Sequence, residues 1–259
     1  MEQIITDKLA KSHITVGFTN SKDDSIQKKM TRYSLADVMD EIPMDYHIQI
    51  IGEESKAQVL AFLRRFFFRD EPLNYNIKLI PEGENSTCIP LEKYSMSSID
   101  ESLSLMAVSS NGNIVGVQLN GTTVAPEDTD EPDFIKNCEN EKFKKILRLL
   151  HYVDRKADVL SRYPDKKMID VKIISVDSNW RGKGIAATLC KKTMEMAKEL
   201  NYDYIRTDAS SHFTGKLCKR LGFEPIYELK YQDYVDSNGK PIFTPAQPHT
   251  CISTYIKKL

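Results

Sequence analysis

Several signatures of common protein classes are missing from this sequence. Its five cysteines are widely spaced and form no C-x-x-C pair, so neither a disulfide framework nor a structural zinc site is expected and the thiols should be reduced. No apolar run approaches the roughly 20 residues of a membrane-spanning helix. The opening segment MEQIITDKLAKSH has no apolar signal core. These absences predict a cytoplasmic protein without a metal site and without a membrane partner.

An excess of positive charge is also missing. The chain has 36 lysines and arginines against 37 aspartates and glutamates, a formal net charge of -1. Because nucleic-acid-binding domains usually carry a basic excess, no nucleic-acid partner is expected. Apolar residues make up 41% of the chain and charged residues 28%, which suits a globular domain with an ordinary core.

The sequence predicts one domain behind a polar extension. Residues 1–43 are polar with little periodicity and are expected to be poorly ordered, whereas 44–259 alternates strand and helix patterns. The expected strands are 46–51, a hairpin over 104–121, 169–176, 204–207, 227–235 and 250–256. The expected helices are one that Pro72 ends, 139–160, 185–200 and 211–221. This mixed order indicates an α/β or α+β domain with a central mixed sheet.

A glycine-containing turn between a predicted strand and a predicted helix is the most informative segment. It reads Arg181–Ala186, with Gly182 and Gly184 beside Arg181 and Lys183. Such a turn binds phosphate because free amides and the helix dipole favour an anion. The Walker-A pattern is excluded because a glycine follows the lysine, and the dinucleotide fingerprint lacks its third glycine. A basic surface turn remains the alternative interpretation.

These residues resemble a known family. R-x-x-G-x-A after Ser175-Val176-Asp177, with Leu221-Gly222-Phe223 downstream, is similar to the GNAT superfamily of N-acetyltransferases. Further segments in the same order resemble the insect arylalkylamine N-acetyltransferases, dopamine N-acetyltransferases included, from about residue 46 to the end. Those segments are 66–74 (FFFRDEPLN), 142–147 (KFKKIL), 174–177 (ISVD), 210–212 (SSH) and 245–249 (PAQPH).

The resemblance implies a fold and a cosubstrate. It implies the GNAT fold, α/β (mixed α+β), with a mostly antiparallel sheet that splays at the cofactor site and is flanked by helices. It implies acetyl-CoA as cosubstrate and a monomer. The residues that it assigns to acetyl-CoA are Ile174, Ser175, Val176, Arg181, Gly182, Lys183, Gly184, Ile185 and Ala186.

The resemblance assigns the general base to Glu71. An alkylamine has a pKa near ~10.4, so acetyl transfer needs a group that removes a proton. Glu71 follows three phenylalanines and precedes Pro72, where partial burial would raise its pKa. Asp70 is the competing carboxylate, and a solvated carboxylate at a helix end is the alternative interpretation.

Two hydroxyl groups complete the implied catalytic set. The family has serines at the positions of Ser210 and Thr214, and the second is threonine here. Ser210 or Ser211 has the alternative role of capping the next helix. Many superfamily members carry a tyrosine acid at the position of Cys218, so that route is absent and a buried helix cysteine is expected.

The amine pocket is less defined by the sequence. Aromatic and histidine side chains are candidates for its walls, although most aromatic residues in such patterns belong to the core. The candidates are Phe67, Tyr75, Phe213, His212 and His249, with Phe66 and Tyr94 as further possible walls. The predicted substrate is a small arylalkylamine of the dopamine, octopamine, tyramine or serotonin type. The alternatives are a polyamine or agmatine, a longer acyl-CoA, and a CoA-binding module without catalysis.

Overall fold

The computed structural model describes residues 45–83, 86–124 and 131–259. The predicted extension, residues 1–43, lies outside this part of the chain. The strands are β1 (Tyr46–Ile50), β2 (Leu105–Ser109), β3 (Ile114–Thr122), β4 (Met168–Val176), β5 (Tyr204–Ala209), β6 (Glu224–Lys230) and β7 (Cys251–Lys258). The α-helices are α4 (Lys56–Phe66), α5 (Pro72–Asn76), α6 (Ile89–Met96), α7 (Asp133–Lys136), α8 (Glu141–Ala157), α9 (Val159–Arg162), α10 (Ile185–Glu199) and α11 (His212–Arg220). Within the described ranges, no helix is long and apolar enough to cross a membrane.

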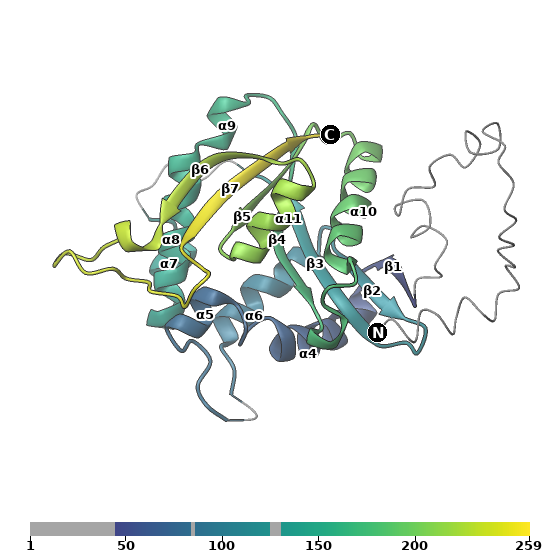
Figure 1. Ribbon diagram of the computed structural model, residues 1–259, viewed down its shortest axis with the longest axis horizontal. Coiled ribbons are helices and arrows are strands. Elements are labelled where there is room, and N and C mark those ends of the chain that lie inside the picture. Colours follow the sequence, from purple (N-terminus) through teal and green to yellow (C-terminus); the bar gives the residue numbers. More distant parts are fainter. Residues whose placement is uncertain (1–44, 84–85, 125–130) are drawn as a thin grey trace, which may run out of the picture. The chain divides into compact units, whose positions relative to one another are not determined.

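One mixed sheet organises the domain, as predicted. Its seven strands follow the order β1-β2-β3-β4-β5-β7-β6, and every neighbouring pair is antiparallel except β4 and β5. The parallel pair is short, since it covers only Met168–Asp170 against Tyr204–Arg206. Beyond that point the two strands separate, which opens the middle of the sheet (Figure 1).

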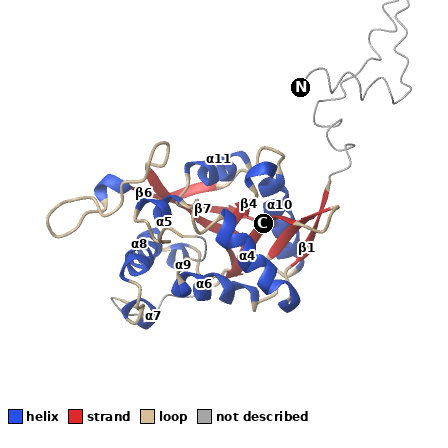
Figure 2. Ribbon diagram, turned by 90° about the horizontal axis from the view of Figure 1, so that it is seen from below, coloured by secondary structure: helices blue, strands red, loops and turns tan. Residues whose placement is uncertain are grey.

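Helices cover both faces of the sheet. Figure 2 shows α10 and α11 on one side, and α4, α6 and α8 on the other. On the α10 side, Ile185 and Leu189 are buried against Val115 of β3. On the opposite side, α8 buries Phe143 and Val153 in the main core cluster. Their spacing places them on one face of an amphipathic helix, so burial of that face holds α8 on the sheet.

The ends of the helices near the site have local causes. Asn140 caps α8, because its Oδ1 accepts the amide hydrogens of Lys142 and Phe143 at 3.1 and 2.9 Å. Ser211 caps α11, where its Oγ accepts the amide hydrogen of Phe213 at 3.2 Å. Ser211 is therefore the capping serine, which leaves the neighbouring Ser210 side chain available for another partner.

The prediction about Pro72 was wrong in one respect. Pro72 does not end the preceding helix, because α4 already ends at Phe66. It begins α5 instead, at the first helical position, where the missing amide hydrogen of proline costs nothing. Glu71 is consequently the N-cap of a new helix. It does not lie at the end of an old one.

Candidate active site

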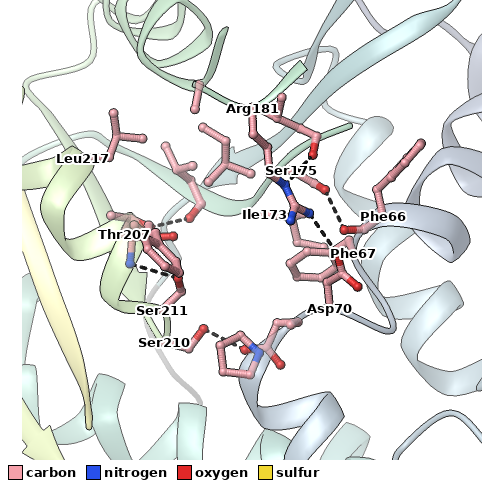
Figure 3. A pocket seen from close by; sticks show the side chains of 18 of the residues that line it. Phe66, Phe67, Asp70, Ile173, Ser175, Arg181, Thr207, Ser210, Ser211 and Leu217 are labelled. Atoms are coloured by element: carbon pink, nitrogen blue, oxygen red, sulfur yellow. Dashed lines mark hydrogen bonds and ion pairs between the residues drawn. The ribbon is translucent and has the colours of Figure 1, made fainter. Parts of the chain in front are cut away.

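A cavity of about 600 Å³ lies where β4 and β5 separate. Its walls come from the α4–α5 connection, the splayed part of β4, the turn before α10, and the start of α11. Figure 3 shows Phe67 and Asp70 on one side of this cavity and Thr207, Ser210 and Ser211 on the other. Segments far apart in the sequence thus meet where β4 and β5 diverge.

Glu71 and Ser210 contact each other in the wall of this cavity. Oε2 of Glu71 accepts the amide hydrogen of Asn74 at 2.8 Å, which is the N-cap bond of α5. Its Oε1 accepts the hydroxyl hydrogen of Ser210, also at 2.8 Å. Both oxygens are therefore held, and the carboxylate has a fixed orientation toward the start of α11.

The environment changes the proton affinity of Glu71. Burial raises the pKa of this carboxyl above its usual value, while the hydrogen bonds from Asn74 and Ser210 act in the opposite direction. Burial disfavours the charged form of the carboxyl, and each hydrogen bond favours it. Burial is the larger of the two effects, so the net change is a raised pKa. A raised pKa makes the carboxylate a better proton acceptor near neutral pH.

Ser210 is held from behind by a residue that the sequence analysis missed. Tyr231 is almost fully buried, and its hydroxyl donates to the main-chain carbonyl oxygen of Ser210 at 2.7 Å. Thr214, the other predicted hydroxyl, also lines the cavity. No motif marks Tyr231, since a tyrosine in the middle of the predicted strand 227–235 has the pattern of an ordinary core residue.

The turn before α10 has the backbone shape that a phosphate site needs. Gly182 and Gly184 have φ values of 82° and 81°, in the left-handed region, and open space lies where a side chain would begin. Gly184 is the N-cap of α10 and has no side-chain cap. The first amide hydrogens of a helix have no partner inside it, so this end of α10 fits an anionic group such as a pyrophosphate.

The charged side chains of this turn have neighbours inside the protein. Arg181 donates from Nε to the carbonyl oxygen of Val176 at 3.2 Å, and its guanidinium pairs with Asp70 at 2.8 Å. Lys183 lies over the ring of Trp180, with its Nζ 4.3 Å from the centroid. Gly182, Arg181 and Ala186 line the cavity. Ile185 instead packs into the core beneath the turn.

The splayed part of β4 supplies the cavity wall opposite α11. Ile174, Ser175 and Val176 line it, and they pair with β3 on one side only, because β5 has already diverged. The Ser175 hydroxyl donates to the carbonyl oxygen of Phe66 at 3.2 Å, which ties β4 to the end of α4. The free strand edge is available to hydrogen-bond an extended ligand.

The predicted amine-pocket residues divide into two groups. Phe67, Phe213 and His249 line the cavity, and the rings of Phe213 and His249 meet edge to face with centroids 5.6 Å apart. Tyr75 and His212 are outside the lining, and Tyr75 is 71% exposed. His212 takes part through its backbone, whose amide hydrogen is accepted by Nδ1 of His249 at 3.2 Å.

Two further predictions concern thiols and metals. Cys218 is buried in α11 outside the cavity lining, and burial raises the pKa of its thiol to about 12. It packs in the core cluster with Tyr255 and Phe223, as expected for a helix cysteine. Across the ranges that the structure describes, no group of histidine, cysteine and acidic residues is arranged to hold a metal ion.

Comparison with known proteins places this geometry in a family. The model of the acetyltransferase (GNAT) family matches residues 78–223. The structure of arylalkylamine N-acetyltransferase 2 from Aedes aegypti is 32% identical, with 83% of this chain and 99% of that chain covered and a TM-score of 0.78. The mosquito arylalkylamine N-acetyltransferase like 5b is 29% identical, with 83% and 100% covered and a TM-score of 0.74. A Drosophila melanogaster polyamine N-acetyltransferase that forms N-acetylagmatine shares the fold at 22% identity, with 83% and 100% covered and a TM-score of 0.70. These matches confirm the resemblance seen in the sequence motifs.

Proposed function

Because this chain belongs to the acetyltransferase (GNAT) family, we propose that it acetylates the primary amine of a small arylalkylamine, with Glu71 as general base. Transfer of the acetyl group of acetyl-CoA to an amine is the reaction of the family, and membership of the family supports the same reaction for this chain. The proposal concerns the type of amine and the residues that perform the transfer.

The observation that carries the proposal is the Glu71–Ser210 contact in the cavity. The amine arrives mostly protonated and must lose a proton before its nitrogen can attack the thioester carbon. Glu71 has a raised pKa and a fixed orientation, which suits it to accept that proton. A new C–N bond then forms and the C–S bond breaks. The second amine proton is lost, and the departing thiolate takes up one proton, so one proton is released to solvent overall.

Residues around the point where β4 and β5 separate would hold acetyl-CoA. The open turn at Gly182 and Gly184 suits the pyrophosphate, and the free edge of β4 at Ile174–Val176 suits the amide groups of the pantetheine arm. Acetyl-CoA supplies the activated acyl group. The protein supplies its alignment with the amine and the exclusion of water.

The aromatic walls support an arylalkylamine. Phe67 and Phe213 line the cavity with His249, and apolar walls of this kind favour an acceptor amine with a large apolar part. The relative that is 32% identical carries the same substrate class in its name. Dopamine, octopamine, tyramine and serotonin are the amines of this class to examine first. The proposed enzyme is a cytoplasmic monomer.

A thiol-release assay with acetyl-CoA tests the proposal. We expect arylalkylamines to be acetylated with higher kcat/KM than aliphatic diamines or agmatine. Glu71→Gln keeps the shape of the side chain but cannot accept the proton, so kcat should fall by about 10²- to 10⁴-fold. Glu139→Gln, at an exposed carboxylate outside the cavity, should behave as the parent does. Acetyl-CoA binding without turnover of any amine would instead indicate a non-catalytic CoA-binding module.

A further inference from the structure

A second cavity, of about 430 Å³, adjoins the active site on the face of the sheet that α8 covers. Tyr94 of α6 and Leu147 and Leu150 of α8 give it apolar walls. Its polar end carries an unusual feature. The buried side-chain polar atoms that lack a hydrogen-bond partner among the described residues are Thr123 Oγ1, His151 Nε2 and Arg206 Nε, and all three residues line this one cavity.

The polar end is built around a buried guanidinium. Arg206 is only 3% exposed, and it donates to Asp154 at 2.6 Å and to Asp208 at 2.7 Å. Asp208 also accepts the hydroxyl hydrogen of Thr254 at 2.5 Å. A third carboxylate, Asp170, lies 3.8 Å from Arg206 Nε, which is too far for a hydrogen bond. A donor and an acceptor therefore face each other across a small gap.

The second cavity shares part of its wall with the first. Both are lined by Val171, Lys172 and Asp208, the residues just beyond the point where β4 and β5 separate. Arg206 and Ser210 are four residues apart along β5 and its continuation, which is about 13 Å in an extended chain. That span suits an arylethylamine whose nitrogen lies near Ser210 and whose ring reaches toward Arg206.

We propose that the second cavity receives the distal end of the acceptor amine, and that Arg206, Asp170 and His151 recognise a hydroxyl group on its ring. This inference rests on the proposed function and adds the chemistry of the substrate's far end. The apolar walls take the ring, and the hydroxyl lies on the cavity side of the Arg206 Nε–Asp170 pair, within hydrogen-bond reach of both.

A hydroxyl group matches the polar atoms better than a second cation does. Its oxygen accepts from the Nε hydrogen of Arg206 while its hydrogen is donated to Asp170. An ammonium or guanidinium group has no acceptor for that Nε hydrogen. It would also add positive charge beside Arg206 and Lys172. Asp154 and Asp208 are already engaged by Arg206, so the cluster offers a second cation less than its three carboxylates suggest.

The test compares three primary amines that differ in the part expected to enter the second cavity. They are 2-phenylethylamine, tyramine, which adds one ring hydroxyl, and agmatine, which replaces the ring with a guanidinium. For the unmodified protein, kcat/KM should be at least ten-fold higher for tyramine than for 2-phenylethylamine. The reason is that 2-phenylethylamine lacks the ring hydroxyl and so leaves buried polar groups of the protein unpaired. Agmatine should be the poorest of the three.

Two variants test the residues separately. Asp170→Ala should reduce the tyramine preference at least ten-fold, and His151→Ala should reduce it as well. His151 is half-buried on α8, so its variant remains informative if removal of Asp170 prevents folding. Glu199→Ala, an exposed carboxylate at the end of α10, is the control that should keep the preference.

Each outcome decides between the inferences. Equal kcat/KM for tyramine and 2-phenylethylamine, or a preference that survives both variants, overturns the hydroxyl site while leaving arylalkylamine acetylation intact. A preference for agmatine that Asp170→Ala abolishes assigns the cavity to a cation and also overturns it. Failure to acetylate any arylalkylamine contradicts the proposed function itself.

Discussion

The hydroxyl of Tyr231 donates a hydrogen bond of 2.7 Å to the main-chain carbonyl oxygen of Ser210. Ser210 in turn donates from its side chain to Glu71 at 2.8 Å. A buried tyrosine from the segment after β6 therefore sets the position of the serine, and the serine sets the position of the carboxylate. Tyr231 does not line the cavity, so its role is to position Ser210.

We expect Tyr231→Phe to lower kcat about three- to ten-fold while the KM for acetyl-CoA stays unchanged. Loss of this hydrogen bond should also lower the free energy of unfolding by about 1 kcal/mol. Steady-state kinetics and thermal unfolding measure both effects. In a Ser210→Ala background the same substitution should have little further effect on kcat, because its influence passes through the Ser210 hydroxyl. Full additivity of the two substitutions would show that Tyr231 acts by another route.

Ser210→Ala should move the acid limb of the kcat/KM–pH profile to higher pH. The Ser210 hydroxyl stabilises the ionised form of Glu71 and so lowers the pKa of that carboxyl. Without it the pKa rises further, the base stays protonated up to a higher pH, and activity appears later as pH increases.

Ser211→Ala is the matched control for that shift. It removes the N-cap bond of α11, which should cost about 1 kcal/mol of stability but leave the acid limb in place. If Ser210→Ala lowers the maximal kcat/KM without moving the acid limb of the pH profile, then Ser210 acts on the leaving thiolate and does not change the pKa of Glu71.

Gly184→Asp should weaken acetyl-CoA binding at least ten-fold, or about 1.4 kcal/mol. The new carboxylate would lie at the free amide end of α10, where a pyrophosphate is expected, and repel it. Gly112→Asp is the control, since Gly112 has a similar φ of 79°, equally open surroundings and a place in the β2–β3 turn. Calorimetry measures the acetyl-CoA affinity of both variants. Equal affinities would show that the pyrophosphate does not bind at the Gly184 turn.

Patterns local in sequence were enough to predict much of this molecule. The turn at Arg181–Ala186, the strand before it and the helix after it form one continuous segment, so periodicity and glycine chemistry identified them. The start of α5 was missed because Pro72 ends one helix and begins another with equal ease, and the tripeptide of phenylalanines hid the end of α4 at Phe66. Only the capping geometry distinguishes the two cases.

Contacts between distant segments were not predictable in the same way. Glu71 and Ser210 are 139 positions apart, and only the family resemblance connected them before the structure did. Asp170 shares its predicted strand with Lys172, and Arg206 is the one charge of the predicted strand 204–207; neither pattern marks a partner. Their meeting depends on the parallel register of β4 and β5, which no local pattern contains.

That meeting has a consequence for stability, because Asp170 is a carboxyl that the fold disfavours as an anion. Burial raises its pKa from 3.8 to about 6, although Arg206 acts in the opposite direction. A carboxyl whose pKa is raised in the folded state destabilises the fold fully above its folded-state pKa and not at all below its unfolded-state pKa.

Asp170→Asn should therefore stabilise the protein by roughly 2–3 kcal/mol at pH 7.5, with the gain shrinking below pH 6 and vanishing near pH 3.5. Asp208→Asn, which loses bonds from Arg206 and Thr254, should destabilise it instead. Denaturant unfolding at several pH values measures both, and a destabilised Asp170→Asn at pH 7.5 would mean that Arg206 requires the third negative charge.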